Sequence, residues 1–131
     1  MFKKIICLAV LLTLFLTGCS SQRDAVLVYS EPMTNSLISG MTAGNYQLFS
    51  KDFDDAMIKA LTEKNFNELL LKLKTNEGTY LSHQVAQVTT KDNFVIVVYT
   101  VKFDKVKNVT MRVVFTSATP HKKSGLWFNP L

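Results

Sequence analysis

Cysteine is scarce in this sequence: the chain of 131 residues has two, Cys7 and Cys19. Both lie before residue 20, so residues 20–131 contain no thiol. This absence excludes a disulfide framework for that part of the chain. The 113 residues from Cys19 to Leu131 are enough to bury a hydrophobic core without such cross-links.

Long apolar runs are also few. The longest near the N-terminus, Ile5–Leu16, has 12 residues, whereas about 20 are needed to cross the hydrocarbon core of a bilayer. Lys3 and Lys4 precede this run and small residues follow it, which is the pattern of an export signal. We therefore predict that residues 1–18 are a signal peptide and not a transmembrane helix.

The end of this signal is more specific. Leu16-Thr17-Gly18-Cys19 resembles the lipobox of bacterial lipoproteins. The resemblance implies that the Cys19 thiol receives a lipid group and becomes the new N-terminus, and that palmitate-like acyl chains anchor the protein, since two or three chains bind a membrane stably. The alternative is an ordinary secretory signal with an incidental cysteine. We predict a lipoprotein on the extracytoplasmic face of the cell membrane, or at an outer membrane if the organism has one.

The charge of the chain is modest. The formal net charge is +5, and it falls to +3 without Lys3 and Lys4, because 13 Lys or Arg then face 10 Asp or Glu. This excess is too small and too evenly spread to indicate binding to nucleic acid. It could favour a position near anionic headgroups, but we interpret it in the first place as a solvated basic surface.

Helical patterns fill the first half of the chain that follows the signal. We interpret residues 19–29 as the lipidated N-terminus with a short tether, and residues 30–131 as one domain. Ser30 can cap a helix that has Pro32 in its first turn, where the missing N–H costs little. A second apolar stripe follows at residues 56–61. Thr62 is a good N-cap for a third helix, which Gly78 closes.

The second half changes to a period of two. Its apolar and β-branched residues alternate with polar ones between short turns, which predicts consecutive antiparallel strands. Helices followed by such strands indicate an α+β fold in which N-terminal helices pack on a four-stranded antiparallel sheet. The predicted strands are Tyr80–Thr89, Phe94–Phe103, Val109–Thr116 and Lys122–Phe128.

One predicted strand, Phe94–Phe103, carries apolar residues on both faces. Such a strand is covered on both sides. We expect helices on one face, and on the other either sheet curvature or a second copy of the chain, which makes a homodimer through the sheet one prediction for the partner.

Recognisable catalytic motifs are absent. We interpret His83 and His121 as solvent-facing, because neither has metal-ligand spacing to another ligand. We interpret Asp52, Asp54 and Asp55 as helix-capping residues and not as a cation site. The chain has neither a nucleophile elbow nor a glycine-rich phosphate loop. We predict no catalytic residue, no metal and no cofactor.

Three stretches carry a family resemblance: residues 44–53, 61–66 and 121–128. They resemble a family of uncharacterised extracytoplasmic domains of bacteria and archaea, over roughly residues 31–128. That family is similar to the nuclear-transport-factor-2-like or cystatin-like class, which implies a cone made of a curved antiparallel sheet wrapped over helices. Asn45 stands where the family commonly has Asp. The resemblance implies no catalytic residue.

Folds of this class often hold a pocket between sheet and helices. The residues that we expect to line one here are the large aromatics Tyr46, Phe49, Tyr99 and Trp127. The alternative is that these side chains belong to the core, where large aromatics are commonly found.

The function predicted on this basis is a non-catalytic module that binds a small ligand or a protein. One alternative is an accessory partner of a separate hydrolase or transporter, suggested by family members fused to an α/β-hydrolase domain. The other is a ketosteroid-isomerase-like enzyme, which needs a buried Asp or His with a hydrogen-bond donor opposite it.

Overall fold

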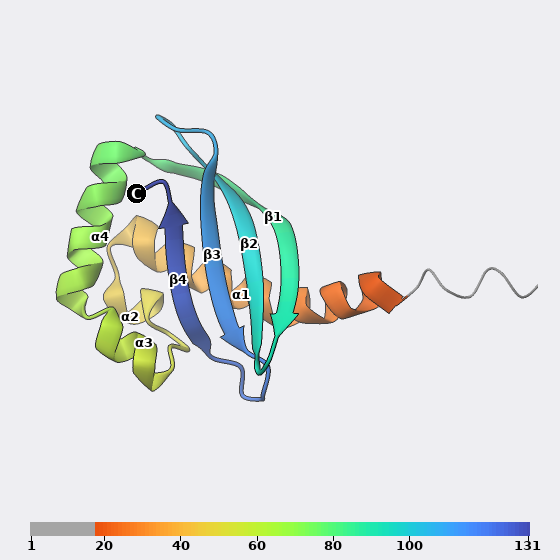
Figure 1. The fold of residues 1–131 in the computed structure, drawn as a ribbon. Coiled ribbons are helices and arrows are strands. Elements are labelled where there is room, and N and C mark those ends of the chain that lie inside the picture. The colour runs from red at the N-terminus through yellow and green to blue at the C-terminus, as the bar shows by residue number, and fades with distance from the viewer. Residues whose placement is uncertain (1–17) are drawn as a thin grey trace, which may run out of the picture.

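The computed structural model describes residues 18–131, which form helices followed by an open four-stranded antiparallel sheet in the order β1-β2-β3-β4 (Figure 1). The α+β prediction is confirmed. Most of the predicted signal peptide lies outside the described residues. The elements are α1 Gly18–Ala43, α2 Tyr46–Phe49, α3 Asp55–Ala60, α4 Glu63–Asn76, β1 Tyr80–Lys91, β2 Phe94–Phe103, β3 Val109–Thr116 and β4 Lys123–Asn129.

The helices cover one face of the sheet. In Figure 1, α1 passes behind the strands, and α2, α3 and α4 lie beyond β4. Leu37 and Ile38 of α1 belong to one buried cluster with Val97 and Val113 of the sheet. We call the helix-covered side of the sheet the inner face and the opposite side the outer face.

Helix α1 begins earlier than the sequence predicted. The predicted start at Ser30 is wrong, because the helix runs through residues 19–29 as well and has Pro32 in its interior. Proline in a helix interior removes one backbone hydrogen bond, to the carbonyl four residues earlier. Pro32 is exposed, and so is Val28, four residues before it. Water can therefore bond to the freed carbonyl, and the helix continues.

The two shorter helices arise where one was predicted. The helix predicted from the apolar stripe at residues 56–61 is α3, and the short helix α2 precedes it. The two are joined by a turn in which Asp52 has a φ of +65°. Asp54 caps α3, since its Oδ1 accepts a hydrogen bond of 2.8 Å from the backbone N–H of Met57. The capping role is thus confirmed for Asp54.

Helix α4 begins and ends as predicted. The Thr62 hydroxyl accepts from the backbone N–H of Asn65 at 3.3 Å, which is N-capping geometry. Gly78 follows the helix with a φ of +94°. A side chain at this position would also collide with the Asp104 carboxylate, so the turn from α4 into β1 requires glycine.

The strand predictions are accurate within two residues. β2 and β3 have the predicted bounds, β1 extends to Lys91, and β4 is shifted by one residue. On β2, the inner-face residues alternate with outer-face ones, so that Val95 and Val97 are buried whereas Phe94 is 40% exposed. On the outer face of this strand Phe94 is exposed and Ile96 and Val98 are half-buried, and none of the described helices covers them (Figure 1).

Candidate functional site

The four aromatic residues predicted to line a pocket do not meet in the structure. Tyr46 and Phe49 lie together on α2, with ring centroids 6.4 Å apart. Phe49 is fully buried and packs on Phe66 at 4.5 Å. The Tyr46 hydroxyl donates to the Leu61 carbonyl at 2.6 Å. These two side chains tie α2 to α4, which is a role in the core.

The other two lie on opposite faces of the sheet. Tyr99 is fully buried on the inner face. Trp127 is 55% exposed, and it pairs with Arg112 of β3 on the outer face. Its indole lies over Gly125, where a Cβ would overlap the ring. One cavity cannot be lined by both residues.

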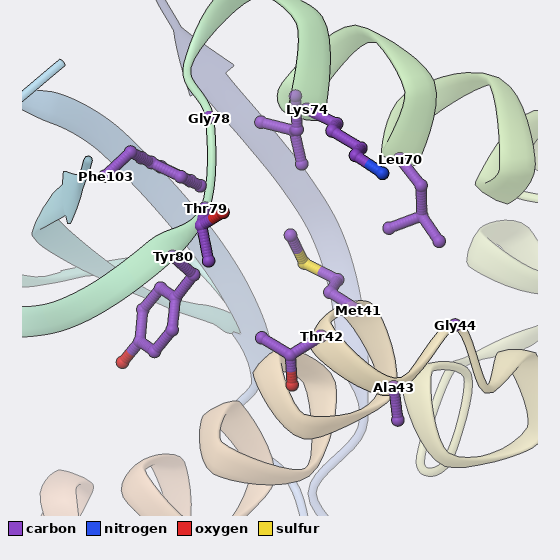
Figure 2. Close-up of a pocket in the computed structure, with 11 residues that line it drawn as sticks. Met41, Thr42, Ala43, Gly44, Leu70, Lys74, Gly78, Thr79, Tyr80 and Phe103 are labelled. Atoms are coloured by element: carbon purple, nitrogen blue, oxygen red, sulfur yellow. The ribbon is translucent and has the colours of Figure 1, made fainter. Parts of the chain in front are cut away.

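A hollow lies instead between the end of α1, α4 and the start of β1. Its volume is about 400 Å³. Figure 2 shows Met41 of α1 directed towards α4 and Leu70 of α4 directed towards α1, with Phe103 and Thr79 on the sheet side. Leu73 and Tyr80 also line it. The lining is mostly apolar, so the hollow suits a ligand with an apolar body.

Lys74 supplies the charge of the hollow. Its side chain is exposed, and Figure 2 shows its ammonium nitrogen over the space next to Leu70. A second, more polar hollow of about 470 Å³ adjoins the first at Ala43 and Gly44 and is lined by Tyr46 and Glu63. The apolar hollow thus has a cation at its edge that can pair with an anionic group.

A chain of polar side chains lies beside this hollow, between α1 and the inner face of the sheet. The Tyr99 hydroxyl donates to Oε1 of Glu31 at 2.9 Å. Its oxygen lies 2.9 Å from Oγ1 of Thr34, and because Tyr99 has a single proton, Thr34 is the donor in that bond. Glu31 and Thr34 are one helical turn apart on α1, so both face the same strand.

His83 and Tyr80 of β1 continue this chain. Oη of Tyr80 lies 2.6 Å from Nδ1 of His83. With Tyr80 as the donor, the proton of a neutral His83 is on Nε2, which lies 3.9 Å from Oε2 of Glu31. The ring of Tyr80 lines the hollow, whereas Figure 2 shows its hydroxyl pointing away from it. Tyr80 therefore joins the hollow to the polar chain.

Burial keeps the tyrosines of this chain protonated. The pKa of Tyr99 is raised above its ordinary value mainly by burial, with the Thr34 hydrogen bond opposing the shift in part. The pKa of Tyr80 is raised by burial and then by the Glu31 carboxylate. Both hydroxyls therefore act as hydrogen-bond donors and not as phenolates near neutral pH.

The prediction that the two histidines face solvent is wrong. The side chain of His83 is 14% exposed. His121 stacks on Tyr29, with ring centroids 3.6 Å apart, and its Nδ1–H donates to the Thr116 carbonyl at 2.9 Å. Their positions depend on how α1 packs across the strands, which a spacing test for metal ligands does not address.

Glu31 is the residue that sequence reasoning missed as part of a site. Its neighbours Ser30 and Pro32 predict only a helix start, and its hydrogen bond with Tyr99 spans 68 positions of sequence. The one available signal was the i, i+3 spacing of Glu31 and Thr34, which places both on the same side of a helix. Within residues 18–131, no cluster of three or more potential ligands could hold a metal ion.

Lys123 is also buried, and it is separate from this polar chain. It is fully buried, and its ammonium donates to the carbonyls of Met33 at 3.2 Å and Phe49 at 3.4 Å. It also lies over the Phe53 ring, 5.4 Å from the centroid. Burial lowers the pKa of Lys123 to about 8, with Asp52 opposing the shift. Lys123 thus links α1, α2 and β4.

Comparison with known proteins identifies one family. A family model described as a protein of unknown function, DUF3887, matches residues 35–119, which is more than half of the chain. The matched region includes the polar chain from Tyr80 to Tyr99 and the lining of the apolar hollow, and it leaves out Glu31 and Trp127. No curated protein and no solved structure matches the chain.

Proposed function

We propose that this chain, which belongs to the DUF3887 family of proteins of unknown function, is a lipid-anchored extracytoplasmic module that binds a small ligand. The ligand has an apolar body and an anionic group. The observation that carries the proposal is the apolar hollow between α1, α4 and β1, with Lys74 at its edge.

The anchor is supported by the sequence at the N-terminus. The lipobox-like Leu16-Thr17-Gly18-Cys19 follows an apolar run of signal-peptide length. Among residues 18–131, no helix is long and apolar enough to cross a membrane. Acylation at Cys19 would hold the first turn of α1, whose residues 20–25 are exposed, at the membrane surface.

The binding role is supported by the shape and chemistry of the hollow. Its volume of about 400 Å³ lies within the size range of small-molecule sites. Apolar side chains from three elements provide contact area, and the hydroxyls of Thr42 and Thr79 provide hydrogen bonds. The packing of α1 on a four-stranded sheet also agrees with the nuclear-transport-factor-2-like class, whose members often bind ligands at this interface.

A dye titration tests the site. The probe is 1-anilinonaphthalene-8-sulfonate, which combines an apolar ring system with an anionic group. We expect its fluorescence to rise on binding to the wild-type domain. Leu70→Trp fills the hollow with an indole and should weaken binding by at least tenfold, since each 1.4 kcal/mol of lost contact is a factor of about ten.

The same helix offers a matched control. Leu71, the next residue, is 67% exposed. Leu71→Trp introduces the same side chain beside the hollow and should leave dye binding unchanged. Equal affinity for both variants would overturn the assignment of the site. Circular dichroism is the check that both variants keep the fold.

A second candidate function is acid–base catalysis, which one observation favours: Glu31 accepts a hydrogen bond from Tyr99, and its other carboxylate oxygen lies 3.9 Å from Nε2 of His83. Catalysis there requires that a ligand in the hollow influences His83 through Tyr80. The His83 ring signals in NMR spectra should then shift when the dye binds. His121, which lies on Tyr29 towards the other end of α1, provides the control signal. Unchanged His83 signals would eliminate this candidate.

A further inference from the structure

The outer face of the sheet has an unusual composition. Its apolar residues come from three adjacent strands, and the register places them beside one another: Ile96 pairs with Val114, and Val114 pairs with Gly125. Trp127 is 55% exposed and Phe94 is 40% exposed. The patch, which we call the outer patch, consists of Phe94, Ile96, Val98, Val114 and Trp127.

Three basic residues lie within or beside the outer patch. Lys91 pairs with Phe94, Lys102 pairs with Ser82, and Arg112 lies between Val98 and Trp127 in the register. All three are exposed. Among the residues that the structure describes, none of the three has a carboxylate within salt-bridge distance.

Acidic residues are missing from all four strands. The charge of the chain is therefore divided between its halves. Residues 79–131 contain seven Lys or Arg against two Asp or Glu, and both acids, Asp92 and Asp104, lie in turns. Residues 18–78 contain six Lys or Arg against eight Asp or Glu. The net charge summed over both halves does not reveal this difference between them.

We propose that the outer patch and its three basic residues dock the domain onto the surface of a bilayer that contains anionic lipid. Tryptophan and phenylalanine are suited to the headgroup region, where apolar surface is buried next to polar groups. Lysine and arginine near this region pair with anionic headgroups. The docking does not require the lipid on Cys19 or a ligand in the hollow.

A second copy of the chain fits this surface less well. Two outer faces packed together would bring Lys91, Lys102 and Arg112 of each copy near the same cations of the other. The strands have no carboxylate to pair with them. Like charges buried in an interface are unfavourable, so charge complementarity favours an anionic surface over self-association.

The position of α1 agrees with this docking. Figure 1 shows α1 behind the strands, with its N-terminal turns extending past the edge of the sheet at β1. The helices therefore leave the outer face uncovered. An acyl anchor at the start of α1 would keep the domain close to the bilayer, which raises the effective concentration of the outer patch at the membrane.

The single tryptophan of the chain makes the test direct, because Trp127 is the only source of indole fluorescence. The protein used begins at Ser20 and carries no lipid, and it retains every residue of the buried core. We expect the emission of Trp127 to shift to the blue with vesicles of phosphatidylcholine and phosphatidylglycerol. With phosphatidylcholine alone, or at high salt, the shift should largely disappear.

Charge variants test the orientation. Replacing Lys91, Lys102 and Arg112 by Gln should weaken vesicle binding about 100-fold, since each basic residue near an anionic surface contributes about fivefold. The matched control replaces Lys59, Lys64 and Lys72 by Gln, which are exposed on α3 and α4 and give the same loss of charge. This control should bind almost as the wild type does.

Three results would overturn the proposal. The first is the absence of a blue shift with anionic vesicles. The second is equal weakening by both sets of substitutions, which would indicate attraction by net charge alone. The third is a blue shift that appears on raising the protein concentration without vesicles, together with a dimer in sedimentation, which would identify a second copy as the occupant.

Discussion

At the scale of single residues, Lys123 is the clearest departure from ordinary composition, because a fully buried lysine has no carboxylate among its hydrogen-bond partners. Its two partners are carbonyls of α1 and α2. A neutral amine can also donate to both carbonyls, whereas a charged ammonium requires desolvation. The protonation of Lys123 is therefore coupled to folding.

Raising the pH should stabilise the protein through Lys123. The pKa is about 8 in the folded chain against 10.5 ordinarily, so the unfolded chain binds more protons between these values. Stability then rises with pH, and we expect a gain of about 2 kcal/mol in the free energy of unfolding from pH 7 to pH 9.5. Urea denaturation at the two pH values measures it.

Lys123→Met provides the comparison for this measurement. Methionine has no titratable group, so the gain between pH 7 and pH 9.5 should vanish. The range ends at pH 9.5 because tyrosines act in the opposite direction at higher pH. The pKa values of Tyr29, Tyr80 and Tyr99 are raised in the folded chain. The unfolded chain therefore loses its tyrosine protons first, and stability falls as the pH rises further. A gain that persists in the variant would contradict the role of Lys123.

The hydroxyl of Tyr99 supports a second prediction at this scale. Tyr99→Phe leaves Oγ1 of Thr34 buried without its partner. Such a loss costs about 1–3 kcal/mol, and denaturant unfolding measures it. Adding Thr34→Val to Tyr99→Phe should remove much of this loss of stability, because the double variant has no unpaired Thr34 hydroxyl. Purely additive effects in the double variant would show that the two hydroxyls are not coupled.

At the scale of elements, the strands were more predictable than the first helix. The alternation in residues 94–103 and the turn residues around Asp92, whose φ is +55°, are local signals, and the structure follows them. Ser30 and Pro32 are also local signals for a helix start, but the helix continues because Pro32 faces solvent. The start of α1 was therefore determined by the exposure of Pro32 in the folded structure and not by a local sequence signal.

The candidate site was less predictable for a related reason. The hollow is formed where the end of α1 meets α4 and the start of β1, and its residues span positions 41 to 103. Aromatic content identified Phe49 and Tyr99, which are core residues, and Tyr46, which lines the adjoining polar hollow. The hollow depends on the angle at which α1 and α4 meet the sheet, and the residue pattern does not specify that angle.

The turn between α4 and β1 supports a further prediction at the scale of elements. Gly78 has a φ of +94°, and a Cβ there would collide with Asp104. Gly78→Ala should therefore destabilise the domain by more than the cost of about 1 kcal/mol expected from backbone conformation alone. Thermal unfolding measures the difference.

Gly44 provides the control for that substitution. Its φ is +65°, and a Cβ there meets nothing within 4 Å. Gly44→Ala should show the conformational cost without the collision, and hence a smaller loss of stability than Gly78→Ala. Equal losses would mean that the Asp104 contact does not restrict this turn.

At the scale of the whole molecule, we propose a lipid anchor, a basic sheet and a ligand-binding hollow in one domain. Lipid attachment is the first prediction here. Labelling of the full chain with palmitate in bacterial cells should be lost in Cys19→Ala and retained in Cys7→Ala, because the lipobox-like motif precedes only Cys19. In membrane fractionation, Cys7→Ala should remain in the membrane fraction and Cys19→Ala should not. Labelling that survives in Cys19→Ala would contradict the anchor.

The central proposal is that the hollow binds a ligand, and native mass spectrometry tests this proposal most directly. The sample is the domain that begins at Ser20, purified without detergent from the cells that express it. We expect an adduct of fixed mass that is present in the wild type and in Leu71→Trp and absent in Leu70→Trp. A spectrum without any adduct, or an adduct that persists in Leu70→Trp, would contradict ligand binding in the hollow.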